Sequence, residues 1–362
     1  MESPKPKFTW NTVLFPLLGL GGFFLYIYLF NVDILGIITT AKTANPFIYT
    51  FAIICGLLEV LFFTISWREL TEFLSIKIRL MRANLYVWYG LYVDTLVPAQ
   101  SISGEVTRTY LVTRDKAGSF GKTVASLYMH RILGMAVNVV ALIAGIVLLF
   151  FSEQIAPLVF NLIIVVAVVI TVFMAFMVML PFKPAWILKV IDWTIRFTRK
   201  ITFGRVKLDK LKNQAIEITA HFHDAMKEFH SNPTPVATSL FYLLITWVFS
   251  LSIPYLVFVS LGHPVPWSLV LITYSIVLAV KAIPVGVPFE VGFPEAVMTT
   301  LYFAMGVDAA LSATATILTR IITLWIRFFI GFGAQQYLEL KPMFTSANDR
   351  KNKTNSANNN RD

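Results

Sequence analysis

The chain has 362 residues, of which 57% are hydrophobic and only 14% are charged. Because soluble domains carry about 25% charged residues, this composition excludes an ordinary soluble domain and indicates a polytopic membrane protein. The formal net charge of +10 does not indicate nucleic-acid binding, since the basic cytoplasmic loops of a membrane protein account for it, and the single cysteine excludes an internal disulfide.

Six stretches are long and apolar enough to cross a membrane, which takes about 20 residues of helix. They are Val13–Phe30, Phe47–Trp67, Val124–Phe151, Leu158–Leu180, Val236–Leu261 and Ala309–Leu338. The first has no small-residue cleavage site and is expected to stay as a signal anchor. Two further apolar stretches, Leu85–Val97 and Trp267–Tyr302, are interrupted by Pro, Gly and charged residues, and we expect re-entrant hairpins or broken spans there.

The charge pattern orients these segments, because the cytoplasmic loops of membrane proteins are enriched in Lys and Arg. Net basic segments lie before residue 8 and at 68–84, 106–122, 182–230 and 341–362, and the opposing loops taken together are slightly acidic. The pattern predicts a multi-pass protein of the cell membrane with both termini in the cytoplasm. It also predicts that the first hairpin enters from the cytoplasm and the second from outside.

The two interrupted stretches share a motif. The first contains VPAQSISGE (Val97–Glu105), in which a glutamate follows Pro98 by seven residues. The second contains VPFEVGFPE (Val287–Glu295), in which a glutamate follows Pro288 by the same seven residues.

Each of these glutamates is followed by an arginine at nearly the same distance. Arg131 comes 26 residues after Glu105, and Arg320 comes 25 residues after Glu295, each within an apolar helix. Each half then holds three spans and one hairpin, and an odd number of spans turns the second copy upside down. Inverted repeats with broken helices are typical of secondary transporters. The alternative is that two unrelated Pro-kinked helices share a spacing.

The predicted fold is an all-α polytopic membrane protein with six full spans and two interrupted or re-entrant hairpins, arranged as an inverted repeat. The first transmembrane repeat covers 1–151, with its hairpin at about 85–113. The second covers 152–340, with a basic cytoplasmic segment at 182–235 and its hairpin at about 267–305. Residues 341–362 lack apolar side chains to bury and are expected to form a disordered cytoplasmic tail.

Irregular backbone survives in hydrocarbon only where it is buried in protein or faces a water-filled cavity. The residues that disrupt the helices of the hairpins are Pro98, Gly104, Pro284, Gly286, Pro288, Gly292 and Pro294. They predict a cavity, in which polar side chains are tolerated when they are paired, hydrated or protonated. The polar side chains are Asp94, Gln100, Ser101, Ser103, Glu105 and Arg108 in the first hairpin, and Glu290 and Glu295 in the second.

Arg131 and Arg320 lie several residues inside apolar helices, too deep for easy contact with the membrane surface. Two compatible interpretations stay open. Each guanidinium holds an anionic group of a substrate with its bidentate fork, or each is locked to the glutamate of its own repeat. Arg327 follows Arg320 by seven residues on the same helical face, and it is either a second cavity charge or a side chain that reaches the cytoplasmic surface.

The sequence offers little for covalent or metal chemistry. It has no nucleophile motif, no nucleotide-binding glycine loop and no histidine cluster with metal-ligand spacing in the spans. His221 and His223 are two residues apart on an expected helix, where such neighbours do not face each other. We therefore expect no metal, no cofactor and no enzymatic activity.

The segment 182–235 is expected to contain an amphipathic helix rich in basic neighbours. Its apolar stripe consists of Leu208, Leu211, Ala215, Ile218, Phe222 and Met226, at steps of three and four residues. Two interpretations stay open, because such a helix either lies on an anionic membrane leaflet or packs on the protein's own cytoplasmic face.

The stretch LVPAQSISGEVTRTYLV, followed by LYMHRILGM, resembles the first signature of the lysylphosphatidylglycerol synthase transmembrane region, a flippase-like family. The stretch AIPVGVPFEVGFPEAVMTTLYFAMGVDAALSATATILTR resembles its later signature, with a G-x-x-E element at Gly292–Glu295. The likeness covers most of residues 10–340 and implies translocation of aminoacylated phospholipids or polyprenyl-phosphate carriers. The chain departs from the family in two respects. No soluble aminoacyl-transferase domain is expected, and the hairpin AQSISGE is richer in Ser and Gln than the glycine- or arginine-containing versions of the family.

These features predict a flippase or transporter that moves an anionic lipid, either a polyprenyl phosphate-linked carrier or an anionic phospholipid, between leaflets by alternating access. Arg131 and Arg320 are expected to hold the head group, and Glu105 and Glu295 to pair with them in the empty state. Glu290 or Glu295 is expected to take a proton. Two alternatives stay open: a non-transporting scaffold that recruits a cytoplasmic, lipid-linked glycosyltransferase, and an intramembrane enzyme that acts on lipid phosphates.

Overall fold

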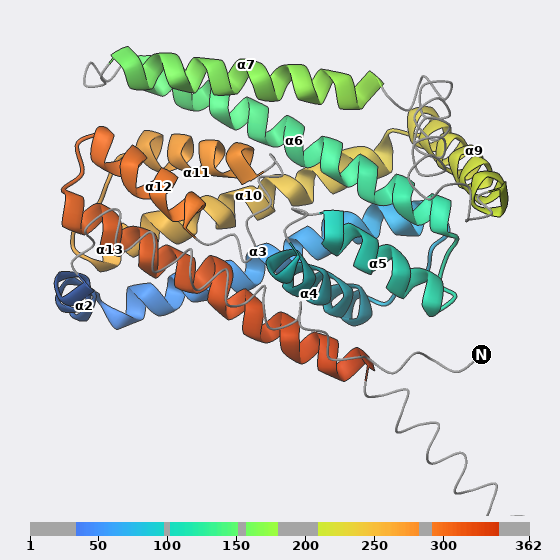
Figure 1. Cartoon of the computed structure of the whole chain (residues 1–362), viewed down its shortest axis with the longest axis horizontal. Coiled ribbons are helices and arrows are strands. Elements are labelled where there is room, and N and C mark those ends of the chain that lie inside the picture. The colour runs from blue at the N-terminus through green and yellow to red at the C-terminus, as the bar shows by residue number, and fades with distance from the viewer. Residues whose placement is uncertain (1–33, 98–101, 151–156, 180–208, 282–291, 340–362) are drawn as a thin grey trace, which may run out of the picture.

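The structure, a computed structural model, describes residues 34–97, 102–150, 157–179, 209–281 and 292–339. Every regular element in these residues is a helix (Figure 1), which confirms the predicted all-α class for the described part of the chain. The helices are α2 (Ile34–Lys42), α3 (Pro46–Phe73), α4 (Leu80–Leu96), α5 (Ile102–Arg114), α6 (Phe120–Phe150), α7 (Pro157–Met179), α9 (Asp209–Ser231), α10 (Thr234–Ser260), α11 (Trp267–Lys281), α12 (Phe293–Ala304) and α13 (Ala309–Arg320). Beyond Arg320, α13 continues through a π-helical segment, Ile321–Ile326, and ends at Glu339.

Four of the described helices are long and apolar enough to cross a membrane. They span Pro46–Phe73, Phe120–Leu148, Thr234–Ser260 and Ala309–Glu339, and they coincide with four of the predicted spans. Helix α7 lies where a fifth span was predicted, at Leu158–Leu180. The predicted span Val13–Phe30 lies outside the described residues, so the total of six spans stays a prediction.

Helices α3 and α10 pack along most of their length and run antiparallel (Figure 1). The N–H of Asn45, at the start of α3, donates to the carbonyl of Ser260, at the end of α10, at 2.7 Å. Toward the other end of α3, the Ser66 hydroxyl donates to the carbonyl of Ser239 at 2.8 Å. The Asn45 side chain also caps α3, which begins with Pro46, a residue suited to the first helical position.

Two pairs of shorter helices occupy the places of the predicted hairpins. Helices α4 and α5 pack on each other, with α4 against α3 and α5 against α6. Helices α11 and α12 pack on each other in the same way, with α11 against α10 and α12 against α13. In Figure 1, α4 and α5 lie toward the end of the bundle that carries α9, and α11 and α12 lie toward the end that carries α2. The two helix pairs therefore belong to opposite ends of the bundle.

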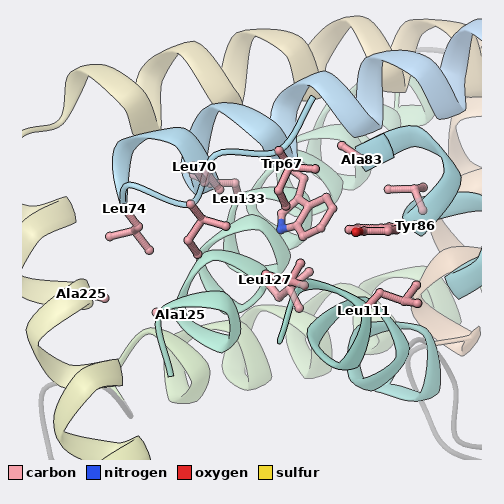
Figure 2. Packing of buried hydrophobic residues seen from close by; sticks show 14 of the residues in the cluster. Trp67, Leu70, Leu74, Ala83, Tyr86, Leu111, Ala125, Leu127, Leu133 and Ala225 are labelled. Carbon is pink, nitrogen blue, oxygen red and sulfur yellow. The ribbon is translucent and has the colours of Figure 1, made fainter. Parts of the chain in front are cut away.

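The largest apolar cluster surrounds Trp67, where α3, α4, α5 and α6 meet (Figure 2). The Trp67 ring is fully buried in this cluster, together with Tyr86, Leu111 and Leu127. Its indole N–H donates to the Ser126 hydroxyl at 3.2 Å, which satisfies the polar group that a buried indole brings with it. This packing fixes the first helix pair against α3 and α6.

Helix α9 packs against α6. Of its predicted apolar stripe, Phe222 and Met226 are buried, and Phe229 extends the stripe by one turn. An ion pair between Lys122 Nζ and Glu228 Oε1, at 3.8 Å, joins the two helices. The C-terminal part of the stripe therefore packs against the protein, which favours the second of the two interpretations that the sequence left open.

Helix α13 passes close to the backbone of α4 at Gly331. A Cβ at this position would lie 2.5 Å from the carbonyl oxygen of Trp88 and 2.7 Å from Cβ of Tyr92. Two residues further along the same helix, the corresponding position at Gly333 has no described atom within 4 Å. The two glycines therefore differ in packing while sharing one helix.

We expect Gly331→Ala to destabilise the protein by about 1–3 kcal/mol, because the added methyl group overpacks a contact with backbone. Gly333→Ala is the matched control, and we expect it to be neutral or to stabilise by up to about 1 kcal/mol through better helix propensity. Thermal unfolding of both variants in one detergent measures the difference. Equal melting temperatures would contradict the close approach of α4 and α13.

Candidate functional site

One face of α3 carries Glu59, Phe63 and Trp67 at steps of four residues, so the three side chains lie in line along the helix. Each of them contacts an arginine from another helix. Glu59 contacts Arg327, and the rings of Phe63 and Trp67 both contact Arg108. This line, the α3 seam, therefore joins a carboxylate and two aromatic rings to arginines from α5 and from the C-terminal part of α13.

The Glu105–Arg131 pair that the spacing indicated is present. Arg131 Nε, on α6, donates to Glu105 Oε1 at 2.8 Å. Glu105 lies in the first turn of α5, where the helix dipole favours a negative charge. About a quarter of each side chain stays exposed, 24% for Arg131 and 23% for Glu105, so the pair is only partly enclosed.

Asp94 holds the N-terminus of α5 in place. Its Oδ1 accepts hydrogen bonds from the Ser103 hydroxyl at 2.7 Å and from the Gly104 N–H at 2.6 Å. A Cβ on Gly104 would collide with the Asp94 carboxylate and would lie 2.7 Å from the carbonyl oxygen of Gly90, so the approach of α4 to α5 needs glycine here. Ser103 and Gly104 thus fix where α5 begins, and so where Glu105 lies.

The second indicated pair, Glu295–Arg320, is present and more deeply buried. Arg320 Nε donates to Glu295 Oε1 at 2.5 Å, and the side chains are only 5% and 3% exposed. Glu295 Oε2 also accepts from the N–H of Gly292 at 2.7 Å, at the start of α12. Gly292 has a φ of +96°, which side-chain-bearing residues rarely adopt, and Pro294 lies in the first turn, where its missing N–H is not needed. One carboxylate therefore holds both a helix N-terminus and an arginine.

A third pair, Glu59–Arg327, was not predicted. Glu59 is buried in α3, and its Oε2 accepts a hydrogen bond from Arg327 Nη2. The π-helical segment Ile321–Ile326 separates Arg327 from Arg320. Because a π turn holds more residues than an α turn, it rotates Arg327 away from the face that carries Arg320. The two arginines consequently meet different helices, α12 and α3, and the ion pair favours the interpretation of Arg327 as an interior charge.

Arg108 is a buried arginine without an ion pair among the described residues. It is 7% exposed, and its guanidinium carbon lies 5.3 Å from the ring centroid of Trp67 and 5.6 Å from that of Phe63. Its Nε donates a long hydrogen bond of 3.4 Å to the carbonyl of Gly104. The two aromatic rings of the α3 seam therefore form much of the immediate surroundings of this cation.

Three arginine nitrogens in the bundle have no hydrogen-bond acceptor within the described residues. They are Arg108 Nη1, Arg131 Nη2 and Arg327 Nε, all buried. A buried donor without an acceptor costs at least about 1–3 kcal/mol. Arg108 and Arg131 also lie within electrostatic reach of each other. An oxyanion between them would supply acceptors and relieve their repulsion, so the arrangement is chemically suited to a phosphate or carboxylate group.

The structure brings most of the predicted charged residues together on three helix contacts, but part of the predicted site lies outside the described residues. The predicted site residues outside the described part of the chain are Pro98, Gln100, Ser101, Pro284, Gly286, Pro288 and Glu290. The sequence reasoning missed Glu59 and its aromatic neighbours on the α3 seam. The signal was available, because Glu59 is the one acidic residue in the predicted span Phe47–Trp67 and an ionisable group inside a span marks a paired or functional site.

Within the described residues no three potential metal ligands come together.

Comparison with known proteins places the chain among membrane proteins. A family model described as the lysylphosphatidylglycerol synthase transmembrane region matches residues 15–331. A UPF0104 membrane protein from Pyrococcus horikoshii is 23% identical over 284 residues, which cover 77% of this chain and 84% of the relative. A UPF0104 membrane protein from Methanothermobacter thermautotrophicus is 22% identical over 301 residues, 82% of this chain and 87% of the relative. A third, from Methanocaldococcus jannaschii, is 20% identical over 299 residues, 82% and 86% of the two chains.

The difference in burial between the two predicted pairs leads to a stability prediction. We expect Arg320→Gln to destabilise by about 3–5 kcal/mol, because it leaves the buried Glu295 carboxylate uncompensated. Arg131→Gln should cost less, because its pair is partly exposed. Thermal unfolding in detergent gives the order.

Arg68→Gln is the control for this series. Arg68 pairs with Glu72 on α3, with side chains 30% and 58% exposed, and its Nε donates to the Ile78 carbonyl at 3.1 Å, so its loss should cost about 1–2 kcal/mol and less than the loss of Arg320. A result in which Arg131→Gln and Arg320→Gln lower the melting temperature equally would show that the exposure of the first pair has no energetic consequence.

Proposed function

Because the chain belongs to the lysylphosphatidylglycerol synthase transmembrane region family, we propose that it moves an anionic lipid between the two leaflets of the cell membrane. The lipid is a polyprenyl phosphate-linked carrier or an anionic phospholipid. Both carry a phosphate group on a long apolar chain, and both would present the same oxyanion to the protein. The activity is transport, with no covalent step.

The observation that carries this proposal is that Arg108 and Arg131 each have one buried guanidinium nitrogen with no acceptor among the described residues. Both arginines lie among helices long and apolar enough to span a membrane, where a buried charged donor without an acceptor is costly and favours a functional role. A guanidinium binds a phosphate in bidentate geometry, so two of them can hold several of its oxygens. In this proposal Arg131 keeps the head-group role expected from the sequence. Arg108 replaces Arg320 as the second arginine that binds the head group, because the Arg320 side chain is almost fully enclosed with Glu295.

An inverted repeat supplies the motion that transport needs. Its first half comprises α3 to α6 and its second half α7 to α13. The packing supports this division, because α3 contacts α4 and α6 just as α10 contacts α11 and α13. Each half also holds one glutamate–arginine pair between the second hairpin helix and the long helix that follows it. The antiparallel course of α3 and α10 is the relation that two inverted copies require.

In this mechanism the head group and the carboxylates compete for the same arginines. Glu105 neutralises Arg131 in the empty state, and the phosphate displaces it when the lipid enters. A ligand shifts a conformational equilibrium only through different affinities for the two states. Exchange of a carboxylate for a phosphate at Arg131 provides such a difference, because the position of α5 depends on the bonds of Glu105 and Asp94.

We propose that both termini lie in the cytoplasm, as the sequence predicts. Exposed or half-exposed basic side chains gather where α3 joins α4 and where α5 joins α6, at the end of the bundle that carries α9 (Figure 1). They are Lys77, Arg79, Arg82, Lys116 and Lys122. At the other end, the last turn of α2 and the turns after α10 and α12 hold only Lys42, His263 and Asp308 as titratable residues. This asymmetry follows the positive-inside rule, with α9 on the cytoplasmic side.

Native mass spectrometry of the gently purified protein tests the binding step. We expect the wild type to retain an anionic lipid, and Arg108→Gln and Arg131→Gln to lose it, because each removes donors to the phosphate. Arg68→Gln, on the surface, should keep it. If both interior variants fold and carry the same lipids as the wild type, the arginines serve only to hold the bundle together, and a scaffold for a cytoplasmic glycosyltransferase becomes the better account.

A vesicle assay tests transport itself. Vesicles containing the protein and NBD-labelled phosphatidylglycerol are treated with dithionite, which bleaches only the label in the outer leaflet. We expect wild-type protein to expose the inner-leaflet label, and Arg108→Gln to slow this about tenfold or more, as loss of a charge-assisted hydrogen bond of about 1.5–3 kcal/mol implies. NBD-labelled phosphatidylcholine should move much more slowly. Equal rates for the two lipids would contradict recognition of an anionic head group.

A further inference from the structure

Three interior ion pairs among the described residues differ in the helices that they join. Glu105–Arg131 connects α5 to α6 and Glu295–Arg320 connects α12 to α13, so each lies within one half of the proposed repeat. Glu59–Arg327 connects α3 of the first half to the C-terminal part of α13, in the second half. If one half rocks against the other, the first two pairs move as units, whereas the third lies across the boundary between the moving parts. Two other described ion pairs also join the halves, Arg114–Glu339 and Lys122–Glu228, but they are more exposed, so Glu59–Arg327 is the most enclosed ion pair between them.

The surroundings of Glu59 determine what happens to its carboxylate when Arg327 leaves. Its side chain is 10% exposed and that of Arg327 is 20% exposed. The titratable groups that face this region of α3 are Arg327 from α13, Tyr274 from α11, and, one turn along at Phe63, His130 from α6 and Arg108 from α5. Helices α10 and α4 contribute the neutral side chains Ser250 and Asn84. Arg327 is thus the cation bonded to Glu59, and its departure would leave a carboxylate in an apolar helix.

The guanidinium of Arg327 has a donor available for a second acceptor. Its Nη2 bonds Glu59 while its Nε, on the same guanidinium, is buried without an acceptor among the described residues. The π-helical segment directly before it sets which way it points. Such segments are strained relative to α-helix and are frequent at functional sites. A return of this segment to α-helical winding would turn Arg327 back toward the face of Arg320 and away from Glu59.

We propose that Glu59 is a proton-binding site that couples proton movement to lipid transport, an inference that rests on the proposed function. When the lipid phosphate binds to Arg108 and Arg131 beside the α3 seam, it also accepts from the free donor of Arg327 and draws this arginine from Glu59. The Glu59 carboxylate, now without its cation in a medium of low dielectric constant, binds one proton from water. When the halves have rocked and the lipid has left, Arg327 returns, and Glu59 releases the proton on the other side.

This exchange has a consequence for the driving force. One negative charge on the phosphodiester and one proton cross together, so the transport step carries no net charge. The membrane potential then does not oppose it, and a proton gradient can drive it. Glu59 replaces Glu290 and Glu295 as the proton carrier, because Glu295 is held by both Gly292 and Arg320 and Glu290 lies outside the described residues.

Proton uptake on binding is measured by titration calorimetry of the full chain in detergent, with dioctanoyl phosphatidylglycerol, in buffers of different ionisation enthalpy. The phosphodiester of this probe does not titrate near neutral pH, so any proton taken up belongs to the protein. We expect the wild type to take up about one proton per lipid bound, as linkage requires when a carboxylate loses its cation. Glu59→Gln should take up no proton per lipid bound, whatever its affinity for the lipid.

Glu59→Asp is the second variant, which keeps a titratable carboxylate at the site and should keep the proton uptake even where Glu59→Gln is poorly folded. Lipid binding by the wild type without proton uptake overturns the inference and leaves the proposed function standing. The same is true if Glu59→Gln takes up as many protons as the wild type. Failure of the wild type to bind this lipid, or any other anionic lipid, overturns the proposed function and the inference with it.

Discussion

The bundle is organised around charge that has to be neutralised away from water. Among the described residues, four arginines face four carboxylates within helices that are otherwise apolar: Arg108, Arg131, Arg320 and Arg327 against Glu59, Asp94, Glu105 and Glu295. A buried charge is tolerated only when it is paired and hydrogen-bonded. The helix breaks, the glycine contacts and the π-helical segment all serve to bring these groups within reach of one another. The broken helices also contribute, because their N-termini supply N–H groups to Asp94 and Glu295.

The two halves of the proposed repeat differ in how their carboxylates bind an arginine and a helix N-terminus. In the second half, Glu295 binds the start of α12 and Arg320 at once, and almost nothing of either side chain is exposed. In the first half these tasks are divided, because Asp94 binds the start of α5 and leaves Glu105 to Arg131 alone. The first half therefore has a partly exposed pair and, beside it, Arg108 held by the rings of Phe63 and Trp67. In the proposed transport, the approximate symmetry accounts for the motion, and the difference between the two halves accounts for the binding site.

Much of this arrangement can be predicted from the sequence, and the exceptions have physical reasons. Span positions follow from hydropathy, and the pairing of Glu105 with Arg131 and of Glu295 with Arg320 follows from a repeated spacing. The π-helical segment could not be foreseen, because IITLWI is equally compatible with α-helical winding, and so the partner of Arg327 could not be foreseen either. Helix α9 shows a second limit. Its amphipathic pattern states that one face is apolar, but only the contact with α6 shows what that face meets.

An experimental structure of the chain in nanodiscs made with phosphatidylglycerol would show most directly whether a lipid phosphate replaces carboxylates on buried arginines. We expect head-group density between α5, α6 and the α3 seam, with phosphate oxygens within hydrogen-bond distance of Arg108 and Arg131 and with Glu105 turned away from Arg131. Lipid density confined to the outer surface of the bundle, with all three ion pairs intact, would contradict it.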